Sequence, residues 1–449
     1  MSQHREHWSS KLGFILAAIG SAVGLGILWK FPYTVGENGG GFFLFSYILC
    51  ILVIGVPVFI AELFLGRTAQ RASVGAFDVL SRGSGGWRIG GYLGLISSFL
   101  IMSFYSVIAG YGLSYVVMSL TGAFAGMDAA QVSSAYDNLT MSGSISLFWH
   151  ALFTAITMAI VVSGVRKGIE FWTKIMTRAL FLILAGLLIY NVRLAGFSQA
   201  LHFIFVPDFS EFNLGSLLEA LGLAFFTLSL GQGIMISYGS YMKKTDNIPN
   251  MSLIVAFSVI VVSILAALVI FPVVFTFDFE PAAGPGLVFK TLPYLFFQLP
   301  GGPIVSTIFF TLFVFTALTS AIPFIEVVAT NMMELTGITR KRAALYVGLA
   351  TFLFGVPSAL AGSGLLFGDW TAIFGRDFLL TIEGIVSTWL IPIGGLVTAI
   401  FVGYIVDEAV LKEEMGTGRF FKPWFTLIKW VIPVAIFLII IQKSGALEF

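Results

Sequence analysis

Two long apolar segments of this chain carry glycines and polar residues where an uninterrupted run of apolar side chains would be expected. The first contains GSAVGLG, residues 20–26, and the other contains SLGQG, residues 229–233. If each segment is a helix inside a membrane, the interruption frees backbone carbonyl and amide groups that lipid cannot satisfy. Freed carbonyls suit a hard cation such as sodium, whereas amides at a helix N-terminus suit a carboxylate. The two breaks together therefore indicate a site for a cation and a zwitterion.

Hydroxyl groups on two further apolar segments suit the same chemistry. TALTSAIPF places Thr319 next to Ser320 at the middle of its segment, and Tyr105 lies well inside SFYSVIAGY. These features also have structural interpretations. Ser and Thr hydroxyls often bond to the preceding helical turn, and Gly20 with Gly24 forms a GxxxG helix-packing motif. The second interrupted segment favours a binding site, because paired broken helices are typical of the central site of membrane transporters.

The composition places these segments in a lipid bilayer. Of the 449 residues, 58% are hydrophobic and 10% are charged, and the mean hydropathy is +0.97. A soluble domain carries about 25% charged residues, so this chain is not expected to be soluble in water. The net charge of +1 gives no indication of a nucleic-acid partner, and the single cysteine, Cys50, excludes an internal disulfide. We therefore expect a multi-pass protein of the plasma (inner) membrane.

About eleven transmembrane helices are expected, because a span needs about 20 apolar residues. The candidate spans are residues 12–35, 42–66, 90–120, 146–163, 169–190, 215–241, 250–276, 303–334, 343–359, 381–405 and 424–441. The two interrupted segments are the first and the sixth of these spans. They occupy equivalent positions if the chain is a repeat of five plus five helices.

Lysine and arginine set the expected orientation. They gather near the N-terminus and in every second loop, whereas residues 121–145, expected as an outer loop, contain neither. Because basic residues are retained on the cytoplasmic side, the N-terminus is predicted to be cytoplasmic. The N-terminal apolar stretch lacks a clear cleavage site and continues past Gly20, so we interpret it as a retained first span rather than a signal peptide.

Seven stretches of the sequence closely resemble the neurotransmitter:sodium symporter family, and within it the bacterial LeuT-like amino-acid transporters. They are REHWSSKLGFILAAIGSAVGLG, FPYTVGENGGGFFLFSYI, GVPVFIAELFLGR, FFTLSLGQG, GPGLVF, LTSAI and IPIGGLVTAIFVGY. The resemblance implies an all-α integral membrane protein with the LeuT-type inverted repeat, in which helices 1 and 6 are broken at mid-membrane. It implies one transporter domain over residues 1–449, with repeats at about 12–190 and 215–405 and an extra helix at about 424–441.

The resemblance also implies where an amino-acid substrate binds. Its carboxylate would meet the amides of Leu25 and Gly26 and the hydroxyl of Tyr105. Its amine would meet the carbonyls of Ala22, Phe226 and Thr227 and the hydroxyl of Ser229. The pocket for the substrate side chain would be lined by Ile101, Tyr105, Phe226, Ser229, Gln232, Ser320 and Phe324.

The resemblance implies that one of the two sodium sites of the family is intact in this chain. Its ligands would be the carbonyls of Gly20, Val23 and Thr316 and the hydroxyls of Thr319 and Ser320. The other site retains Thr227 and the carbonyl of Ala22, but Ile27 and Val259 stand where the family places side-chain oxygens. We therefore expect it to be weakened or empty. The chloride position keeps Tyr47, Thr227 and Ser263 but has Leu223 in place of a glutamine, so chloride dependence is not expected.

Charged residues match the two gates of the family. Lys30 and Glu383 occupy the positions of the outer Arg–Asp pair of the family. They keep opposite charges, but lysine cannot form the two parallel hydrogen bonds that an arginine guanidinium makes with a carboxylate. The inner gate would consist of Arg5, Glu334 and Tyr241. In helix five Gly168 is retained, whereas Arg178 replaces a proline that helps the helix to unwind. The sequence leaves open whether Arg178 is interfacial or paired.

The leading hypothesis is a sodium-coupled importer of a neutral amino acid, hydrophobic or aromatic, that works by alternating access with only one intact sodium site. Gln232 also allows a polar or amphipathic substrate. The alternative is a non-transporting amino-acid sensor or regulatory protein. A transporter that had changed to such a role would be expected to lose side-chain ligands of an ion site. An enzyme is not expected, since the four histidines have no metal-binding spacing and no nucleophile–histidine arrangement is visible. The sequence gives no indication of the oligomeric state.

Overall fold

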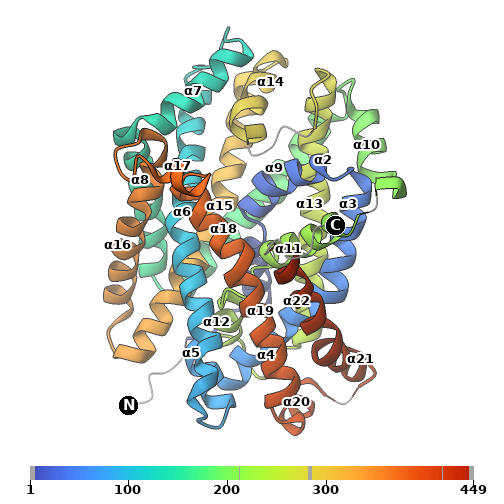
Figure 1. The fold of residues 1–449 in the computed structure, drawn as a ribbon, viewed down its shortest axis with the longest axis vertical. Helices are drawn as coiled ribbons and strands as arrows, with labels where there is room; N and C mark the ends of the chain where they lie inside the picture. Colours follow the sequence, from blue (N-terminus) through green and yellow to red (C-terminus); the bar gives the residue numbers. More distant parts are fainter. Residues whose placement is uncertain (1–5, 212, 282–285, 417, 444–449) are drawn as a thin grey trace.

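The regular elements of the computed structural model are all helices in the part it describes, residues 6–211, 213–281, 286–416 and 418–443 (Figure 1). Within these ranges, nine continuous helical segments are long and apolar enough to cross a membrane. They are Gly41–Ala69, Gly85–Leu120, Gly143–Val162, Val165–Asn191, Ile248–Thr276, Gly302–Thr336, Arg340–Ser363, Phe378–Ile405 and Phe421–Gln442. Each corresponds to one predicted span.

The first and the sixth predicted spans are interrupted. α1 (Lys11–Ala22) and the helical segment Gly26–Glu37, which ends in α2 (Phe31–Glu37), form one span bent by 43°. α11 (Leu214–Thr227) and α12 (Ile234–Gly239) are separated by the non-helical residues 228–233. None of these pieces is long enough to cross a bilayer by itself. Together with the nine continuous segments, the two broken spans account for all the apolar segments that the sequence predicts.

The continuous spans contain most of the remaining helices. These are α3 (Gly41–Cys50), α4 (Val56–Ala69), α6 (Arg88–Leu120), α8 (Gly143–Val162), α9 (Phe171–Asn191), α13 (Ile248–Thr276), α15 (Gly302–Thr336), α16 (Arg340–Ala359), α18 (Phe378–Ile385), α19 (Ile391–Ile400), α21 (Phe421–Thr426) and α22 (Ile432–Lys443). α15 and α6 pack against each other along the centre of the bundle, and α1 also packs on α15. In the apolar stretch of Gly302–Thr336, 83% of the residues are buried within the protein, against 28% for Phe421–Gln442. The eighth span is therefore central, and the last span lies at the periphery of the bundle.

Shorter helices cover the two ends of the bundle. They are α5 (Ser73–Leu80), α7 (Ala129–Met141), α10 (Phe197–Phe205), α14 (Leu292–Gln298), α17 (Trp370–Phe374) and α20 (Glu408–Met415). α5 and α20 lie at the end where the chain begins, which we call the N-terminal end, and α7, α10 and α14 lie at the opposite end (Figure 1).

The outer loop expected over residues 121–145 contains a helix, α7. The helix begins at a capping box: the side chain of Asp128 accepts from the Gln131 amide at 2.8 Å, and the Gln131 side chain accepts from the Asp128 amide at 3.0 Å. These two bonds satisfy backbone donors that a helix start otherwise leaves free. The stretch is polar enough to escape a search for apolar spans, yet it is helical.

Candidate functional site

The break in the first span exposes backbone between α1 and α2. Val23 ends α1 with φ −89° and ψ 83°, and helical structure resumes as a π-helical turn over Gly26–Lys30. Such turns often mark functional positions. At Gly24 a Cβ atom would lie 2.3 Å from Oγ of Ser320 and 2.9 Å from the hydroxyl of Tyr105. Only glycine allows α6 and α15 to approach the break this closely.

Hydrogen bonds to neighbouring spans hold the break in the sixth span. Ser229, Gly231 and Gly233 all have positive φ, and Ser229 is strained at φ 55° because it carries a Cβ atom. Its hydroxyl donates to the Ser21 carbonyl at 3.1 Å. The Gly231 amide donates to Oε1 of Glu62 at 2.7 Å. The unwound backbone of the sixth span is therefore tied both to the first span and to a fully buried carboxylate on α4.

Glu62 and Ser21 are not among the residues predicted from the sequence. The signal for Glu62 was present, because AELF places a carboxylate inside an apolar segment, and an ionisable residue within a membrane helix is a functional candidate by default. Ser21 carried no such signal. Its carbonyl accepts from the hydroxyls of Ser229 and Ser320, and its own hydroxyl lies 3.2 Å from Oγ of Ser229. Only the packing of three spans reveals these contacts.

Oxygen atoms from the first and the eighth spans converge at the break of α1. The Ser320 hydroxyl lies 3.1 Å from the Gly20 carbonyl and 2.8 Å from the Ser21 carbonyl. One residue before, Oγ1 of Thr319 lies 3.0 Å from the Thr316 carbonyl, and its Cβ lies 3.0 Å from where a Cβ of Gly20 would be. Neutral carbonyl and hydroxyl oxygens are the donors that hard cations prefer. This cluster contains Gly20, Thr316, Thr319 and Ser320 of the predicted intact sodium site, and Val23 lies at the break beside it.

The hydroxyl of Thr319 also follows the structural interpretation. It donates to the preceding turn, to the carbonyls of Phe315 at 3.1 Å and Thr316 at 3.0 Å. A hydroxyl that donates in this way keeps its lone pairs, which are free to face a cation. The back-bonding and the ion-binding interpretations of Thr319 are therefore compatible.

Several residues of the predicted substrate pocket lie next to the break. The Leu25 amide donates to the Tyr105 hydroxyl at 3.2 Å, and the Tyr105 ring meets the Phe324 ring edge-on with centroids 5.4 Å apart. A Cβ on Gly26 would lie 2.7 Å from the Phe226 ring, so this ring packs directly on the first span. Ile101 and Gln232 are buried as well. Tyr105 thus covers an amide that is predicted to receive the substrate carboxylate.

The predicted weakened ion site contains two apolar side chains. Ile27 and Val259 are both 0% exposed, and the turn Gly26–Lys30 packs against α13, which carries Val259. Neither side chain has an oxygen to offer. The remaining hydroxyl, that of Thr227, is engaged within the protein, since it accepts from the Tyr47 hydroxyl at 2.8 Å and donates to the Leu223 carbonyl at 2.9 Å.

The residues of the predicted chloride position also lie together. The Tyr47 hydroxyl, which bonds to Thr227, is 3.3 Å from Oγ of Ser263. The Ser263 hydroxyl in turn donates to the Val259 carbonyl at 2.9 Å. These hydroxyls therefore satisfy each other and nearby carbonyls, and Leu223 adds no polar side chain to the cluster.

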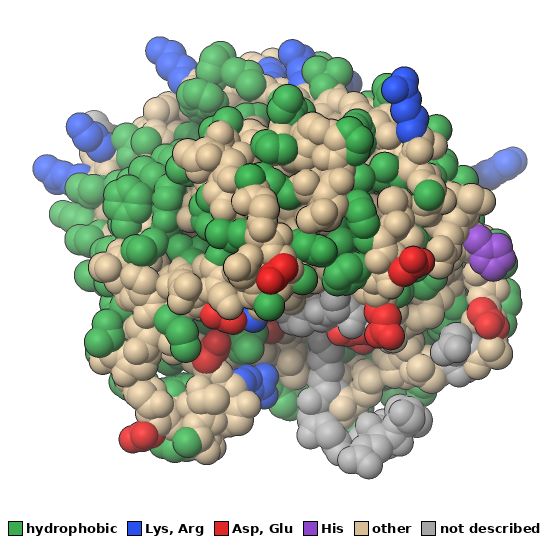
Figure 2. Space-filling model, turned by 90° about the horizontal axis from the view of Figure 1, so that it is seen from above, with side chains coloured by type: hydrophobic (Ala, Val, Ile, Leu, Met, Phe, Trp, Pro, Cys, Tyr) green, Lys and Arg blue, Asp and Glu red, His purple; other side chains and the backbone are tan. Residues whose placement is uncertain are grey.

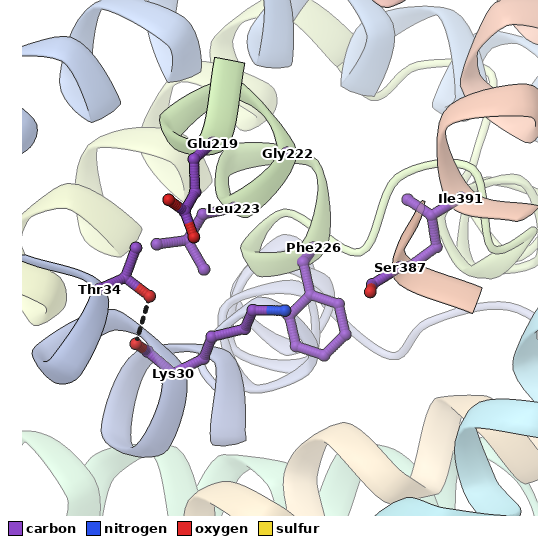
Figure 3. A pocket seen from close by; sticks show the side chains of 8 residues that line it. All are labelled: Lys30, Thr34, Glu219, Gly222, Leu223, Phe226, Ser387 and Ile391. Atoms are coloured by element: carbon purple, nitrogen blue, oxygen red, sulfur yellow. Dashed lines mark hydrogen bonds between the residues drawn. The ribbon is translucent and has the colours of Figure 1, made fainter. Parts of the chain in front are cut away.

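Toward the opposite end, Lys30 and Glu383 form an ion pair. Nζ of Lys30 lies 2.9 Å from Oε1 of Glu383, and the two side chains are 21% and 18% exposed. Figure 3 shows the ammonium group beside the Phe226 ring, and the distance to the ring centroid is 5.8 Å. Lys30 and Phe226 line a cavity of about 30 Å³ whose lining also includes Glu219. Seen from above, this end carries several acidic side chains near its middle (Figure 2).

At the N-terminal end, the predicted inner gate includes a buried ion pair that the sequence analysis missed. Oε1 of Glu326 accepts from the Tyr241 hydroxyl at 2.5 Å, and Glu326 pairs with Arg340 at 2.7 Å. Glu326 is fully buried, and the signal for it was again a carboxylate inside an apolar span, in FIEVV. Glu334 accepts from the Ala72 amide at 2.9 Å. Arg5 lies outside the described residues.

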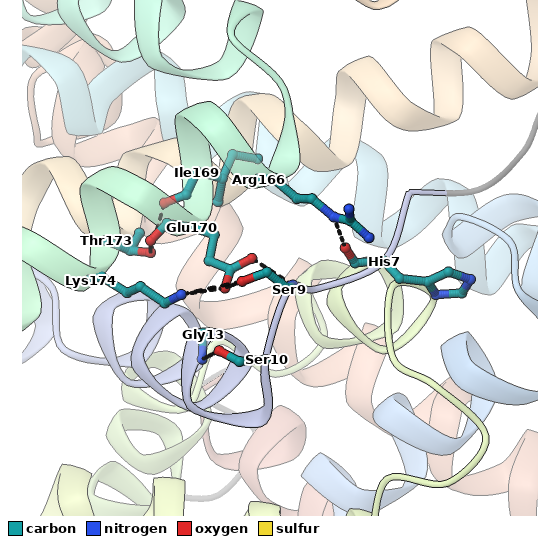
Figure 4. Close-up of polar contacts among 9 residues, drawn as sticks. All are labelled: His7, Ser9, Ser10, Gly13, Arg166, Ile169, Glu170, Thr173 and Lys174. Atoms are coloured by element: carbon teal, nitrogen blue, oxygen red, sulfur yellow. Dashed lines mark hydrogen bonds and ion pairs between the residues drawn. The ribbon is translucent and has the colours of Figure 1, made fainter.

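The segment before α1 is tied to the helices around it. Oε2 of the buried Glu170 accepts from the Ser9 amide at 2.9 Å, and its Oε1 accepts from the Ser9 hydroxyl and from Lys174 (Figure 4). Arg166 donates to the His7 carbonyl at 2.8 Å. On the other side, the Trp8 indole donates to the Tyr238 carbonyl at 3.1 Å. The start of the first span is therefore held against α9 and α12.

The two positions of the fifth span differ in environment. Gly168 lies in a π-helical turn, Val165–Glu170, where a Cβ atom would be 2.1 Å from the Ile160 carbonyl. Arg178 lies on the exposed face of α9, between the exposed side chains of Ile175 and Leu182. It makes no hydrogen bond or ion pair within the described residues, so no partner inside the bundle accounts for it.

Comparisons with known proteins agree with this geometry. The chain matches the sequence model of the Sodium:neurotransmitter symporter family over residues 5–142 and 127–447. It is 37% identical over 447 residues to an uncharacterized sodium-dependent transporter of Bacillus subtilis, YhdH, with 98% of each chain covered. It is also 33% identical over 299 residues to the sodium-dependent neutral amino acid transporter B(0)AT2 of Bos taurus, which covers 60% of this chain and 40% of that protein.

A solved structure shares the whole architecture. The crystal structure of MhsT in complex with L-phenylalanine matches with a TM-score of 0.91 and 39% sequence identity, covering 98% of this chain and 100% of that one. This match confirms the predicted all-α fold of the LeuT type.

Proposed function

The chain belongs to the sodium:neurotransmitter symporter family of transporters, and from this premise we propose that it imports a neutral amino acid, hydrophobic or aromatic, together with one sodium ion. The observation that carries the proposal is the oxygen cluster at the break of α1. There the Ser320 hydroxyl meets the carbonyls of Gly20 and Ser21 within 3.1 Å. The carbonyls of Gly20, Val23 and Thr316 and the hydroxyls of Thr319 and Ser320 would hold the cation.

The coupling to a single ion rests on Ile27 and Val259. Both side chains are fully buried and apolar, and a cation in a low-dielectric site with too few oxygens is strongly disfavoured. The ion at the intact site would bridge the first and the eighth spans and stabilise the break. The substrate would then bind beside it, with its carboxylate replacing the Tyr105 hydroxyl at the Leu25 amide.

The substrate class rests on the pocket walls. Tyr105, Phe226 and Phe324 supply three aromatic rings close to the break, and aromatic walls favour an apolar or aromatic side chain. L-phenylalanine bound to MhsT, a protein of the same architecture, supports this choice. The protein would lie in the plasma (inner) membrane with its N-terminal end in the cytoplasm, as the distribution of Lys and Arg indicates.

Alternating access requires that the two ends of the bundle open in turn. Lys30 with Glu383 would close the outer end, and Tyr241 with Glu334 and Arg5 the inner end. The Glu326–Arg340 pair adds a second charged contact at the inner end. When the inner end opens, the hydrogen bonds between Ser9 and Glu170 and between Trp8 and Tyr238 would have to break.

Uptake into proteoliposomes tests the proposal. We expect a panel of labelled amino acids to show accumulation that requires an inward sodium gradient, with a sodium Hill coefficient of about one if a single ion is coupled. A gradient of potassium in place of sodium is the control. If no amino acid is accumulated with sodium, the transporter proposal is wrong. If the coefficient is near two, the single-ion proposal is wrong.

The sensor alternative draws on the same buried Ile27 and Val259, because a protein that only senses an amino acid needs no ion gradient. It predicts amino-acid binding without sodium-driven accumulation. The proteoliposome experiment therefore separates the two functions when it is combined with a binding assay on the same preparation.

The outer pair gives a further prediction. Replacing Lys30 with Gln leaves Glu383 partly buried without its cation, so we expect uptake to fall roughly three- to tenfold. Exchanging the two charges, Lys30→Glu with Glu383→Lys, should recover part of the loss in uptake assays. The matched control is the same exchange at Arg82 and Asp407, a pair that is 79% and 45% exposed and should have no effect. A native uptake rate in Lys30→Gln would contradict the gate role.

A further inference from the structure

Gln232 is a buried side chain whose amide has no partner among the described residues. It is 1% exposed, and neither its Nε2 nor its Oε1 makes a hydrogen bond. Most buried polar side chains in proteins are paired, and leaving both a donor and an acceptor unpaired is costly. An apolar residue of similar size would avoid this cost. The hydrogen bonds that the amide lacks must therefore come from a group that is not part of the protein.

The position of Gln232 suggests what that partner is. Its carbonyl accepts from the Ser98 hydroxyl of α6 at 2.6 Å. Ser98 lies about one helical turn before Ile101 and about two turns before Tyr105 on the same helix. Gln232 also lies in the non-helical stretch 228–233, three residues after Ser229. Its backbone is thus fixed beside residues of the proposed substrate pocket.

Resting on the proposed function, we propose that the substrate is an amino acid whose aromatic ring carries a hydrogen-bonding group, and that the Gln232 amide pairs with this group. The rings of Tyr105, Phe226 and Phe324 would enclose the apolar body of the substrate side chain. The amide offers one acceptor and one donor group, so it can pair with a phenol hydroxyl or with an indole N–H. A phenyl ring would leave it unpaired.

A site built to hydrogen-bond its substrate discriminates strongly against an analogue that lacks the polar group. The test therefore uses pairs of ligands of similar shape that differ in that group: tyrosine against phenylalanine, and tryptophan against 3-benzothienylalanine, in which sulfur replaces the indole N–H. Apparent affinities are measured in sodium with the purified full-length protein in nanodiscs. We expect the native protein to prefer each polar member by roughly tenfold to a hundredfold. Equal or weaker binding of the polar members would overturn the proposal.

The variant Gln232→Met keeps the length of the side chain and removes the amide. It should abolish the preference within each pair. A preference that persists in Gln232→Met would overturn the role of the amide. The matched control is Gln442→Met, since Gln442 also has an unpaired carbonyl oxygen but lies in a groove with Asn38 and Glu219. This control should keep the native preference.

The comparison within the native protein needs no variant, so the proposal stays testable if Gln232→Met does not fold. Its failure is also distinct from that of the proposed function. If phenylalanine and aliphatic amino acids are accumulated with sodium and polar rings are not preferred, only this inference is wrong. If no amino acid binds or is accumulated, the proposed function and this inference both fail.

Discussion

Replacing Thr319 and Ser320 together by alanine is expected to abolish sodium-driven uptake. The Ser320 hydroxyl lies at the break of α1, within 3.1 Å of the Gly20 and Ser21 carbonyls, and the neighbouring Thr319 packs its side chain against Gly20. A hydrogen-bonding group that faces a charge contributes about 1.5–3 kcal/mol. Two such oxygens therefore account for roughly 3–6 kcal/mol, a loss of at least about 100-fold in sodium affinity.

Two measurements separate this effect from loss of the fold. Sodium should raise the melting temperature of the native protein, because a ligand that binds only the folded state stabilises it, and it should not raise that of the variant. Thr307→Ala with Thr311→Ala is the control, since these hydroxyls on the same helix also donate to the preceding turn but lie about two or more turns before Thr319 and Ser320. A sodium-dependent shift that survives in Thr319→Ala with Ser320→Ala would refute the proposed ion site.

Ile27→Asn combined with Val259→Asn is expected to create a second sodium site, so that two ions are coupled to uptake. The two side chains are buried, and asparagine would supply the side-chain oxygens that the proposed weakened site would otherwise lack. In uptake assays the sodium Hill coefficient should rise from about one to about two. Each coupled ion adds about 1.4 kcal/mol of driving force for a tenfold sodium gradient, so the limiting accumulation of the amino acid should rise roughly tenfold.

The same variant predicts a specific dependence of stability on sodium. Without the ion, each buried amide is left unpaired at a cost of about 1–3 kcal/mol, so the melting temperature should fall in sodium-free buffer and recover when sodium is added. Val255→Asn is the matched control, because Val255 is an equally buried valine one turn away on α13. This control should lower the melting temperature without any recovery in sodium. An unchanged Hill coefficient in the double variant would argue that the second site was never vacant.

The sequence by itself determined the architecture of this protein. A chain with 58% hydrophobic and 10% charged residues can bury its apolar segments only in lipid, and every span must then satisfy its own backbone as a helix. The glycines at 20, 24, 231 and 233 located both breaks, because a helix in lipid rarely carries such a cluster without a reason. The resemblance to the family identified Ile27 and Val259 as positions of an ion site, and their residue types show that neither side chain carries an oxygen.

Only the tertiary structure decided which polar groups meet. Ser21 meets Ser229 and Ser320 only because three spans pack together. Glu62 and Glu326 acquire their partners, the Gly231 amide and Arg340, from other parts of the chain. The unpaired amide of Gln232 is likewise visible only once every neighbouring donor and acceptor is placed. The physical reason is that hydrogen bonds are short and directional, so a partner is defined by a few tenths of an ångström in three dimensions. Hydrophobicity and backbone conformation, in contrast, are largely properties of each residue and its neighbours in the chain.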